Sequence, residues 1–263
     1  MNCFICNGRM SFYFVKDFKG ACGLRKVEYW RCEVCGQTVS KTHFDMAQSD
    51  WERLNQRYHA SYQRTNANPD DPRWMERINA QASTIANLSK NGFLPRDNPW
   101  IDYGCGDGKL SNLLNNAGIN LLKFDSYMFD SERDYVGEKS LIKNHYDVVV
   151  NTSVFEHVRS INVLDEIAGL VSEQGVFALH VLVVECVPKD PEWFYLIPAH
   201  CAFYTNKSMQ ILFKRWCFKA SVYHVESRMW FWFKTNVNAV KKFVQAKNDN
   251  AYCFKSGFMD YWK

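Results

Sequence analysis

The segment WIDYGCGDGKL, residues 100–110, has the spacing that most clearly indicates chemistry. A short apolar stretch ends at Asp102, glycines follow at 104, 106 and 108, and a helical pattern begins at Lys109. A strand that turns into a helix through glycines lets a cofactor lie against nearly bare backbone. Lys109 stands where the dinucleotide fingerprint G-x-G-x-x-G has its third glycine, so the spacing favours a different cofactor. The alternative is a tight turn without a ligand.

An acidic residue follows the next predicted strand. The apolar run 119–124 is typical of a strand and ends at Asp125, with Ser126 beside it. In nucleotide-binding βαβ units an acid at this place accepts hydrogen bonds from the ribose hydroxyls. The alternative for Asp125 is a solvated loop acid.

A second polar cluster follows the apolar run Val148–Val150, which predicts a strand buried on both faces of a parallel sheet. Asn151, Glu156 and His157 come next and therefore fall at the C-terminal edge of that sheet. Ligands of open α/β sheets bind at this edge.

These residues resemble two motifs of the class I methyltransferases that use S-adenosylmethionine (SAM). Asp-x-Gly-x-Gly-x-Gly, residues 102–108, resembles motif I, and Asp147 with Glu156-His157-Val158 resembles the segment around the fourth strand. The resemblance implies that the glycines pack against the amino-acid part of SAM and that Asp102 holds the loop and the cofactor's ammonium group. The predicted cofactor contacts are Asp102, Gly104, Cys105, Gly106, Gly108, Asp125, Ser126, Asn151 and Glu156.

Methyl transfer from a sulfonium needs positioning and, for a hydroxyl acceptor, a base that takes the proton. His157 and His200 are the predicted catalytic residues, because imidazole ordinarily titrates near neutrality. The segment from His200 resembles the H-x-x-F-[FY]-[ST] segment of sugar and polyketide-type methyltransferases, which borders the acceptor. Two alternatives stay open: either histidine could be structural, and Glu156 could orient His157 or help to bind a divalent ion, as its counterpart does in some ubiquinone-type O-methyltransferases.

Two helical patterns precede the first strand of the sheet, one around Trp51–Tyr62 and one around Trp74–Ile85. Class I methyltransferases commonly use such leading helices as a lid over the cofactor and a wall of the substrate site. On that resemblance we predict that Tyr58, His59 and Tyr62 bind substrate. The alternative is that these aromatic side chains pack against the sheet.

The amino-terminal part carries an independent signal for a metal. Its four cysteines, Cys3, Cys6, Cys32 and Cys35, form two C-x-x-C knuckles, with a spacer slightly longer than that of the common zinc pattern. Four thiolates suit a closed, structural, tetrahedral Zn²⁺ site on a zinc ribbon. Disulfide-bonded or buried cysteines are the alternative, but disulfides belong to oxidising compartments.

The order of predicted elements over 99–184 alternates strands and helices, which favours an α/β fold with helices on both faces of a parallel sheet. With antiparallel strands at 220–226 and 229–234, it predicts a Rossmann-like, seven-stranded methyltransferase sheet. Ser160 is expected to begin a helix that ends at Gly175, before a strand over 176–184. The short stretch between Asp125 and Asp147 leaves room for a shortened helix and third strand at most.

The 263 residues are predicted to divide into four segments. They are a zinc-ribbon module (1–45), a helical linker or lid (46–98), a class I methyltransferase domain (99–235) and a helical, aromatic tail (236–263). A net charge of +4 and a pI near 8.4 are weaker than expected of a dedicated nucleic-acid binder. No stretch reaches the ~20 apolar residues of a membrane span, so no membrane insertion and a cytoplasmic location are expected.

The sequence therefore predicts a SAM-dependent methyltransferase acting on a small-molecule acceptor, most specifically a hydroxyl of a sugar, a glycan precursor or a secondary-metabolite precursor. One alternative is an RNA base methyltransferase whose zinc module recognises the nucleic acid. A second is a non-catalytic protein that binds the cofactor or partners only. The oligomeric state is not predicted.

Overall fold

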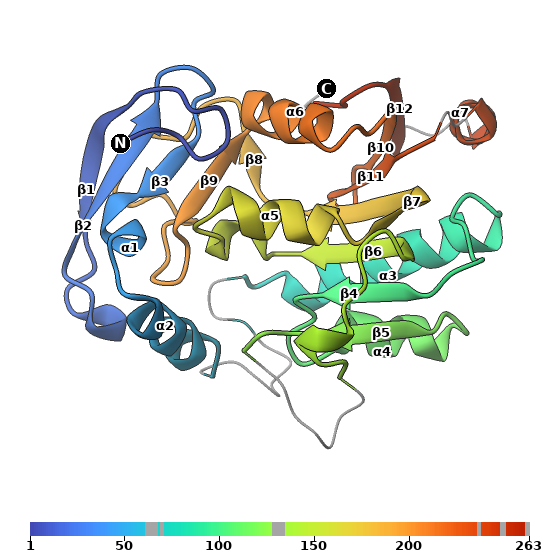
Figure 1. Cartoon of the computed structure of the whole chain (residues 1–263), viewed down its shortest axis with the longest axis horizontal. Helices are drawn as coiled ribbons and strands as arrows, with labels where there is room; N and C mark the ends of the chain where they lie inside the picture. The colour runs from blue at the N-terminus through green and yellow to red at the C-terminus, as the bar shows by residue number, and fades with distance from the viewer. Residues whose placement is uncertain (61–67, 69–70, 128–134, 236–237, 248–250, 261–263) are drawn as a thin grey trace.

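The computed structural model describes the chain except for residues 61–67, 69–70, 128–134, 236–237, 248–250 and 261–263. The described strands form two sheets, one of seven strands and one of five. Figure 1 shows the five-stranded sheet, with the blue N-terminal strands, at one side of the seven-stranded sheet.

The seven-stranded sheet has the order β12-β10-β11-β7-β6-β4-β5. Strands β5, β4, β6 and β7 run parallel, whereas β11, β10 and β12 each pair antiparallel with their neighbours. This arrangement confirms the predicted α/β class and the seven-stranded sheet. The strands are β4 (Trp100–Tyr103), β5 (Leu121–Phe124), β6 (Tyr146–Thr152), β7 (Val171–His180), β10 (Ala220–His224), β11 (Met229–Phe233) and β12 (Tyr252–Ser256).

Helices cover both faces of this sheet, because its central strands are apolar on both sides. In β6, Val148 and Val150 pack into one core cluster and Val149 into the other. Helices α3 (Trp74–Lys90), α4 (Lys109–Asn116) and α7 (Asn238–Lys247) lie on the first side, and α5 (Ile161–Ala168) and α6 (Asn206–Arg215) on the second. Within the described part of the chain, no helix is long and apolar enough to cross a bilayer.

The seventh strand differs from the expected one. Between β5 and β6 the described residues form only a short 3₁₀ turn, η2 (Glu138–Ser140), and one isolated parallel bridge between Lys123 and Tyr135. The sequence had indicated room for at most a shortened helix and third strand between Asp125 and Asp147. The count of seven is reached instead in the tail, where β12 pairs with β10 from Ala220–Ser256 to His224–Tyr252.

The predicted end of α5 at Gly175 is wrong. The helix begins where expected, with the Ser160 side chain accepting from the Asn162 N–H, but it ends at Ala168. The chain has already joined the sheet at Val171, which pairs with Tyr146. The pairing of β6 with β7 shifts register after Tyr146–Val171 and resumes at Val148–Val176. The residues up to Gly175, where the sequence had suggested the helix stop, lie within this irregularity.

A capping box begins α6. The Thr205 hydroxyl accepts from the Ser208 N–H, and the Ser208 hydroxyl accepts from the Thr205 N–H. The turn after this helix uses Cys217 with φ 59°, a left-handed conformation more often taken by glycine.

The N-terminal strands complete their sheet with strands from much later in the chain. Strand β3 pairs antiparallel with β9, Thr38 opposite Phe203, and β9 pairs parallel with β8. The sheet therefore joins the cysteine-bearing segment to the segment that follows the central sheet. Its strands are β1 (Met10–Asp17), β2 (Lys26–Cys32), β3 (Thr38–Ser40), β9 (Ala202–Thr205) and β8 (Val183–Val184).

One arginine fixes the next two helices, α1 (Lys41–Phe44) and α2 (Gln48–Ala60), against the rest of the chain. Arg159 donates from Nη1 to the carbonyls of His43 at 2.7 Å and Met46 at 2.8 Å. Its guanidinium also lies 5.2 Å from the centre of the Trp51 ring. These contacts hold α2 beside the C-terminal edge of the central sheet.

Candidate active site

A cavity of about 930 Å³ opens at the C-terminal ends of β4, β5 and β6. This is the edge at which ligands bind in open α/β sheets. The glycine loop after β4 forms one part of its lining, and α2, the start of α3 and the loop before β9 form others. Elements distant in sequence therefore meet at one concave site.

The three glycines of the loop all have left-handed backbone, for different reasons. A Cβ on Gly104 would lie 2.4 Å from a Val154 methyl, so the close approach of a neighbouring loop requires glycine there. A Cβ on Gly106 would meet nothing within 4 Å, because that residue faces open space in the cavity. Gly108, with φ 76°, precedes the first turn of α4 and does not line the cavity.

Two carboxylates hold this loop. Asp102 is buried and accepts from the Ser111 hydroxyl at 2.7 Å, and its other oxygen, Oδ1, has no hydrogen-bond partner among the described residues. Asp125 Oδ2 accepts from the Gly106 N–H at 2.9 Å. Burial raises the pKa of Asp102 to about 7. A cationic group beside the orphaned oxygen would satisfy it and favour the charged carboxylate.

Of the other predicted cofactor residues, three line the cavity and one lies behind it. Cys105, Ser126 and Glu156 line the cavity. Asn151 does not; it is fully buried, and its amide donates to the Tyr103 carbonyl at 2.9 Å. Asn151 therefore supports the end of β4 from behind.

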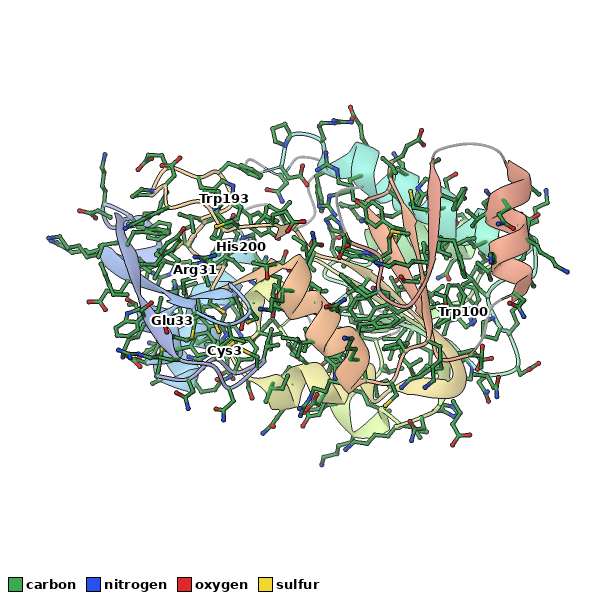
Figure 2. The ribbon with its side chains drawn as sticks, turned by 90° about the horizontal axis from the view of Figure 1, so that it is seen from above. Cys3, Arg31, Glu33, Trp100, Trp193 and His200 are labelled. Atoms are coloured by element: carbon green, nitrogen blue, oxygen red, sulfur yellow. The ribbon has the colours of Figure 1, made fainter. Side chains whose placement is uncertain are left out.

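Histidines from three segments meet on another part of the lining. The His157 ring lies 4.9 Å from that of His200 and 5.0 Å from that of His59, measured between centroids. Glu156 Oε1 is 4.0 Å from His200 Nε2. In Figure 2, His200 lies beside Trp193 on the side of the N-terminal strands, whereas Trp100, at the start of β4, lies far from it. Both predicted catalytic histidines thus face the cavity.

Helix α2 contributes two of the three predicted substrate residues to this cavity. Tyr58 and His59 both line it, and their rings are 5.5 Å apart. Tyr62 lies outside the described residues. The position of α2 supports the prediction that the leading helices form a wall of the site.

Sequence reasoning missed several side chains of the lining. Arg77 pairs with Asp71 through two bonds of 3.1 and 2.8 Å, and Trp74 stands beside it at the start of α3. Tyr195 donates to Glu156 Oε1 at 2.7 Å, and Tyr135, which supports the glycine loop from outside the lining, donates to the Gly106 carbonyl at 2.6 Å. Trp74 and Arg77 belong to the second predicted leading helix, from which no site residue was named, and Tyr195 and Tyr135 lie in segments without periodicity.

Asp147, part of the motif resemblance, has a structural position. It lies at the start of β6, at the edge of the sheet opposite the cavity, and is buried. Its carboxylate accepts from the Asn98 N–H at 2.8 Å, the Asn98 amide at 3.0 Å and the Ser172 hydroxyl at 2.9 Å. It therefore fastens the N-terminal ends of the central strands.

The four knuckle cysteines converge, with all four sulfur atoms within 4.8 Å of one another. The Sγ atoms of Cys3 and Cys35 are 3.6 Å apart, and those of Cys6 and Cys32 are 3.4 Å apart. These distances are far longer than a disulfide bond of about 2.05 Å. They are close to the spacing of about 3.8 Å between sulfurs in a tetrahedral site with Zn–S bonds of about 2.3 Å.

The backbone of both knuckles repeats one turn. Asn7 and Gly36, each directly after the second cysteine of a knuckle, have left-handed φ values of 59° and 75°. Each donates its N–H to the carbonyl of the first cysteine, Cys3 at 2.9 Å and Cys32 at 3.0 Å. The shared turn directs both sulfurs of a knuckle to the same point.

Burial lowers the pKa of five histidines, four of which line the cavity, and this predicts a marked loss of stability in acid. The pKa falls to about 4 for His43 and His59, to about 3 for His180 and His200, and well below 6.5 for His157. The unfolded chain protonates these rings below pH 6.5 while the folded chain does not, so their contribution is present above pH 6.5 and is lost as pH falls.

Asp102 and Glu156 oppose this trend, because burial raises the pKa of each to about 7. The five histidines outnumber them, so the free energy of unfolding should fall by several kcal/mol between pH 6.5 and pH 5. Denaturant unfolding at a series of pH values measures this. The variant His180→Asn should reduce the slope by about 1.4 kcal/mol per pH unit, and an equal slope in both proteins would contradict the assignment.

The fold and cavity define an open α/β protein with a concave site at the C-terminal edge of its parallel strands. A family model described as a methyltransferase domain matches residues 73–219, so the chain belongs to that family. The predicted enzyme class, a SAM-dependent methyltransferase, is confirmed.

Several solved structures are similar to this chain. One is magnesium protoporphyrin IX methyltransferase from Synechocystis PCC 6803 with bound SAM, at 15% identity and TM-score 0.49, covering 72% of this chain and 100% of that one. Another is Burkholderia thailandensis 1,6-didemethyltoxoflavin-N1-methyltransferase, at 11% identity and TM-score 0.49, covering 79% of this chain and 93% of that one. A search of curated proteins found no match.

Proposed function

We propose that the chain transfers the methyl group of SAM to a hydroxyl of a small molecule, such as a sugar or secondary-metabolite precursor. The observation that carries this proposal is that the glycine loop and the histidine cluster face the same cavity of about 930 Å³. That volume lies within the roughly 300–1,000 Å³ of small-molecule sites. A flexible polynucleotide would require a broad basic surface, which the net charge of +4 does not favour.

In this proposal the acids of the glycine loop bind the donor. SAM carries a sulfonium and an ammonium cation, and the orphaned Asp102 Oδ1 is an acceptor beside the loop. Asp125 directly follows β5 and lines the cavity, and we propose that it binds the ribose hydroxyls. Gly106 leaves the space in which the cofactor would lie.

The histidine cluster would then border the acceptor and take part in removing its proton. Burial keeps His157 and His200 neutral at pH 7, the form that accepts a proton. The same burial makes each a weak base on its own, because a protonated ring would be poorly solvated. Tyr58 and His59 of α2 close the same side and are proposed to contact the acceptor.

The four cysteines are proposed to bind a structural Zn²⁺. The support is the convergence of four sulfurs within 4.8 Å and the matched turns of the two knuckles. Four protein ligands leave no open position on the ion, so this zinc would stabilise the fold and take no part in the chemistry.

The purified protein with radiolabelled SAM and fractionated cell extract tests the acceptor class. Label should enter a low-molecular-weight or glycan fraction that resists RNase, and the Gly106→Arg variant should transfer none. Label in RNase-sensitive material would overturn the small-molecule proposal in favour of an RNA acceptor. No transfer to any fraction, together with tight SAM binding, would favour the non-catalytic alternative.

A further inference from the structure

Glu156, His157 and His200 form a second group of side chains with the geometry of metal ligands. One donor atom from each lies within 4.8 Å of the other two. Glu156 and His157 belong to the 3₁₀ turn η3 (Phe155–His157) after β6, and His200 belongs to the loop before β9. All three line the cavity, so an ion bound here would be accessible to the acceptor.

Two atoms of this group have no hydrogen-bond partner among the described residues although they are buried. They are Oε2 of Glu156, a residue only 1% exposed, and Nδ1 of His157. A buried polar atom left unsatisfied costs about 1–3 kcal/mol, and more when it is charged. Both atoms belong to one cluster, and a cation between them would satisfy both.

The remaining polar atoms of the cluster have the hydrogen bonds that usually orient metal ligands. His200 Nδ1 lies 2.9 Å from the Tyr195 carbonyl, so that nitrogen carries the proton and Nε2 presents its lone pair. Tyr195 donates to Glu156 Oε1 at 2.7 Å. Partners of this kind fix the tautomer and direction of ligating side chains.

The donor set indicates which ions fit. Two imidazoles and one carboxylate suit Zn²⁺, Fe²⁺ and related transition metals, whereas Mg²⁺ and Ca²⁺ prefer sites made of oxygen atoms. Three protein ligands leave at least one position of the ion open.

We propose that Glu156, His157 and His200 bind a divalent transition-metal ion, with Zn²⁺ as the probe, and that this ion binds the acceptor hydroxyl; this role rests on the proposed function. The metal lowers the pKa of the bound hydroxyl, whose proton leaves to solvent. The oxygen then forms a bond to the methyl carbon of SAM as the carbon–sulfur bond breaks, and S-adenosylhomocysteine departs as a neutral thioether. The weak base at this site is thereby replaced by a Lewis acid.

The test counts Zn²⁺ bound to the full chain by elemental analysis and measures its affinity by calorimetry. Wild type should bind one equivalent beyond the cysteine site. Glu156→Gln, His157→Asn and His200→Gln should each keep the zinc of the cysteine site. Each should bind the second equivalent at least about 100-fold more weakly, so that it is lost from the purified protein. Tyr195→Phe, which keeps all three ligands, should weaken it about 10- to 100-fold. His145→Gln, outside the cavity, is the matched control and should keep both.

Denaturant unfolding, measured on every variant, reports whether the fold is intact, and the SAM affinity of the wild type separates this inference from the proposed function. Wild type that binds SAM but only the cysteine-site zinc would overturn the second metal site and leave the methyltransferase proposal standing. A second equivalent that persists in all three ligand variants would also overturn it. If a ligand variant fails to fold, the wild-type count and Tyr195→Phe still decide the question.

Discussion

Replacing Cys32 and Cys35 together (Cys32→Ser, Cys35→Ser) is expected to abolish methyl transfer while SAM binding stays within a few-fold of wild type. Loss of the structural zinc should unfold the knuckles, since metal binding supplies much of the folding free energy of such small modules. The Thr205 hydroxyl donates to the Cys35 carbonyl at 2.5 Å, and the Ser40 N–H donates to the Cys201 carbonyl at 2.8 Å. The disturbance therefore reaches the loop that carries His200.

The cofactor end of the site should be spared. The glycine loop is held by β4, β5 and α4, and α4 packs into the core cluster on the face of the sheet that has no contact with the cysteines. We expect at least about a 100-fold loss of transfer rate and a loss of several kcal/mol in the free energy of unfolding. Cys22→Ser, in the same module but outside the four-sulfur group, is the control.

Three measurements test the predictions for this double variant. Elemental analysis gives the zinc content, denaturant unfolding the stability, and calorimetry with SAM the state of the cofactor end. An equivalent of zinc that survives both substitutions would disprove a site made of four thiolates. Transfer at the wild-type rate in a zinc-free protein would disprove the coupling between the knuckles and the His200 loop.

The second large effect concerns the donor. Gly106→Arg should weaken SAM binding by at least about 100-fold, because the side chain would occupy the open space beside the loop and place a cation near the sulfonium. Gly118→Arg is a matched control: Gly118 also has a left-handed φ, 77°, and open space around it, but lies at the end of α4 away from the cavity.

Both substitutions impose a similar backbone strain, on the order of 1 kcal/mol, so a difference in SAM affinity isolates the position. Calorimetric titration measures that affinity, and unfolding curves show that both variants fold. Equal SAM affinities in the two variants would show that SAM does not bind at the glycine loop.

The sequence predicted the elements whose signals are local. The glycine loop, the strand before it and the helix start at Ser160 depend on residues within a few positions of one another, and all three occur in the structure. The convergence of the four cysteines was also predictable, because two C-x-x-C knuckles at this separation are a specific pattern for a shared metal site.

The features that sequence reasoning missed depend on partners far along the chain. Gly175 looked like a helix stop, but pairing of Val171 with Tyr146 had already drawn the chain into the sheet. Strand β12 carried no alternation that distinguished it from an aromatic tail, and its place depends on β10. Arg77 and Tyr195 reach the cavity only because α3 and the loop before β9 meet there.

The pairing of β3 with β9 has a consequence for the order of folding during synthesis. The cysteine-bearing segment leaves the ribosome well before residues 202–205, yet its sheet is incomplete until they arrive. Contacts of such high sequence separation form slowly, because a long loop must close before they can be made. Until then β3 exposes an unpaired edge that other chains could recognise. Newly made protein should therefore pass through a stage that is prone to aggregation and that ends only when the His200 loop has been synthesised.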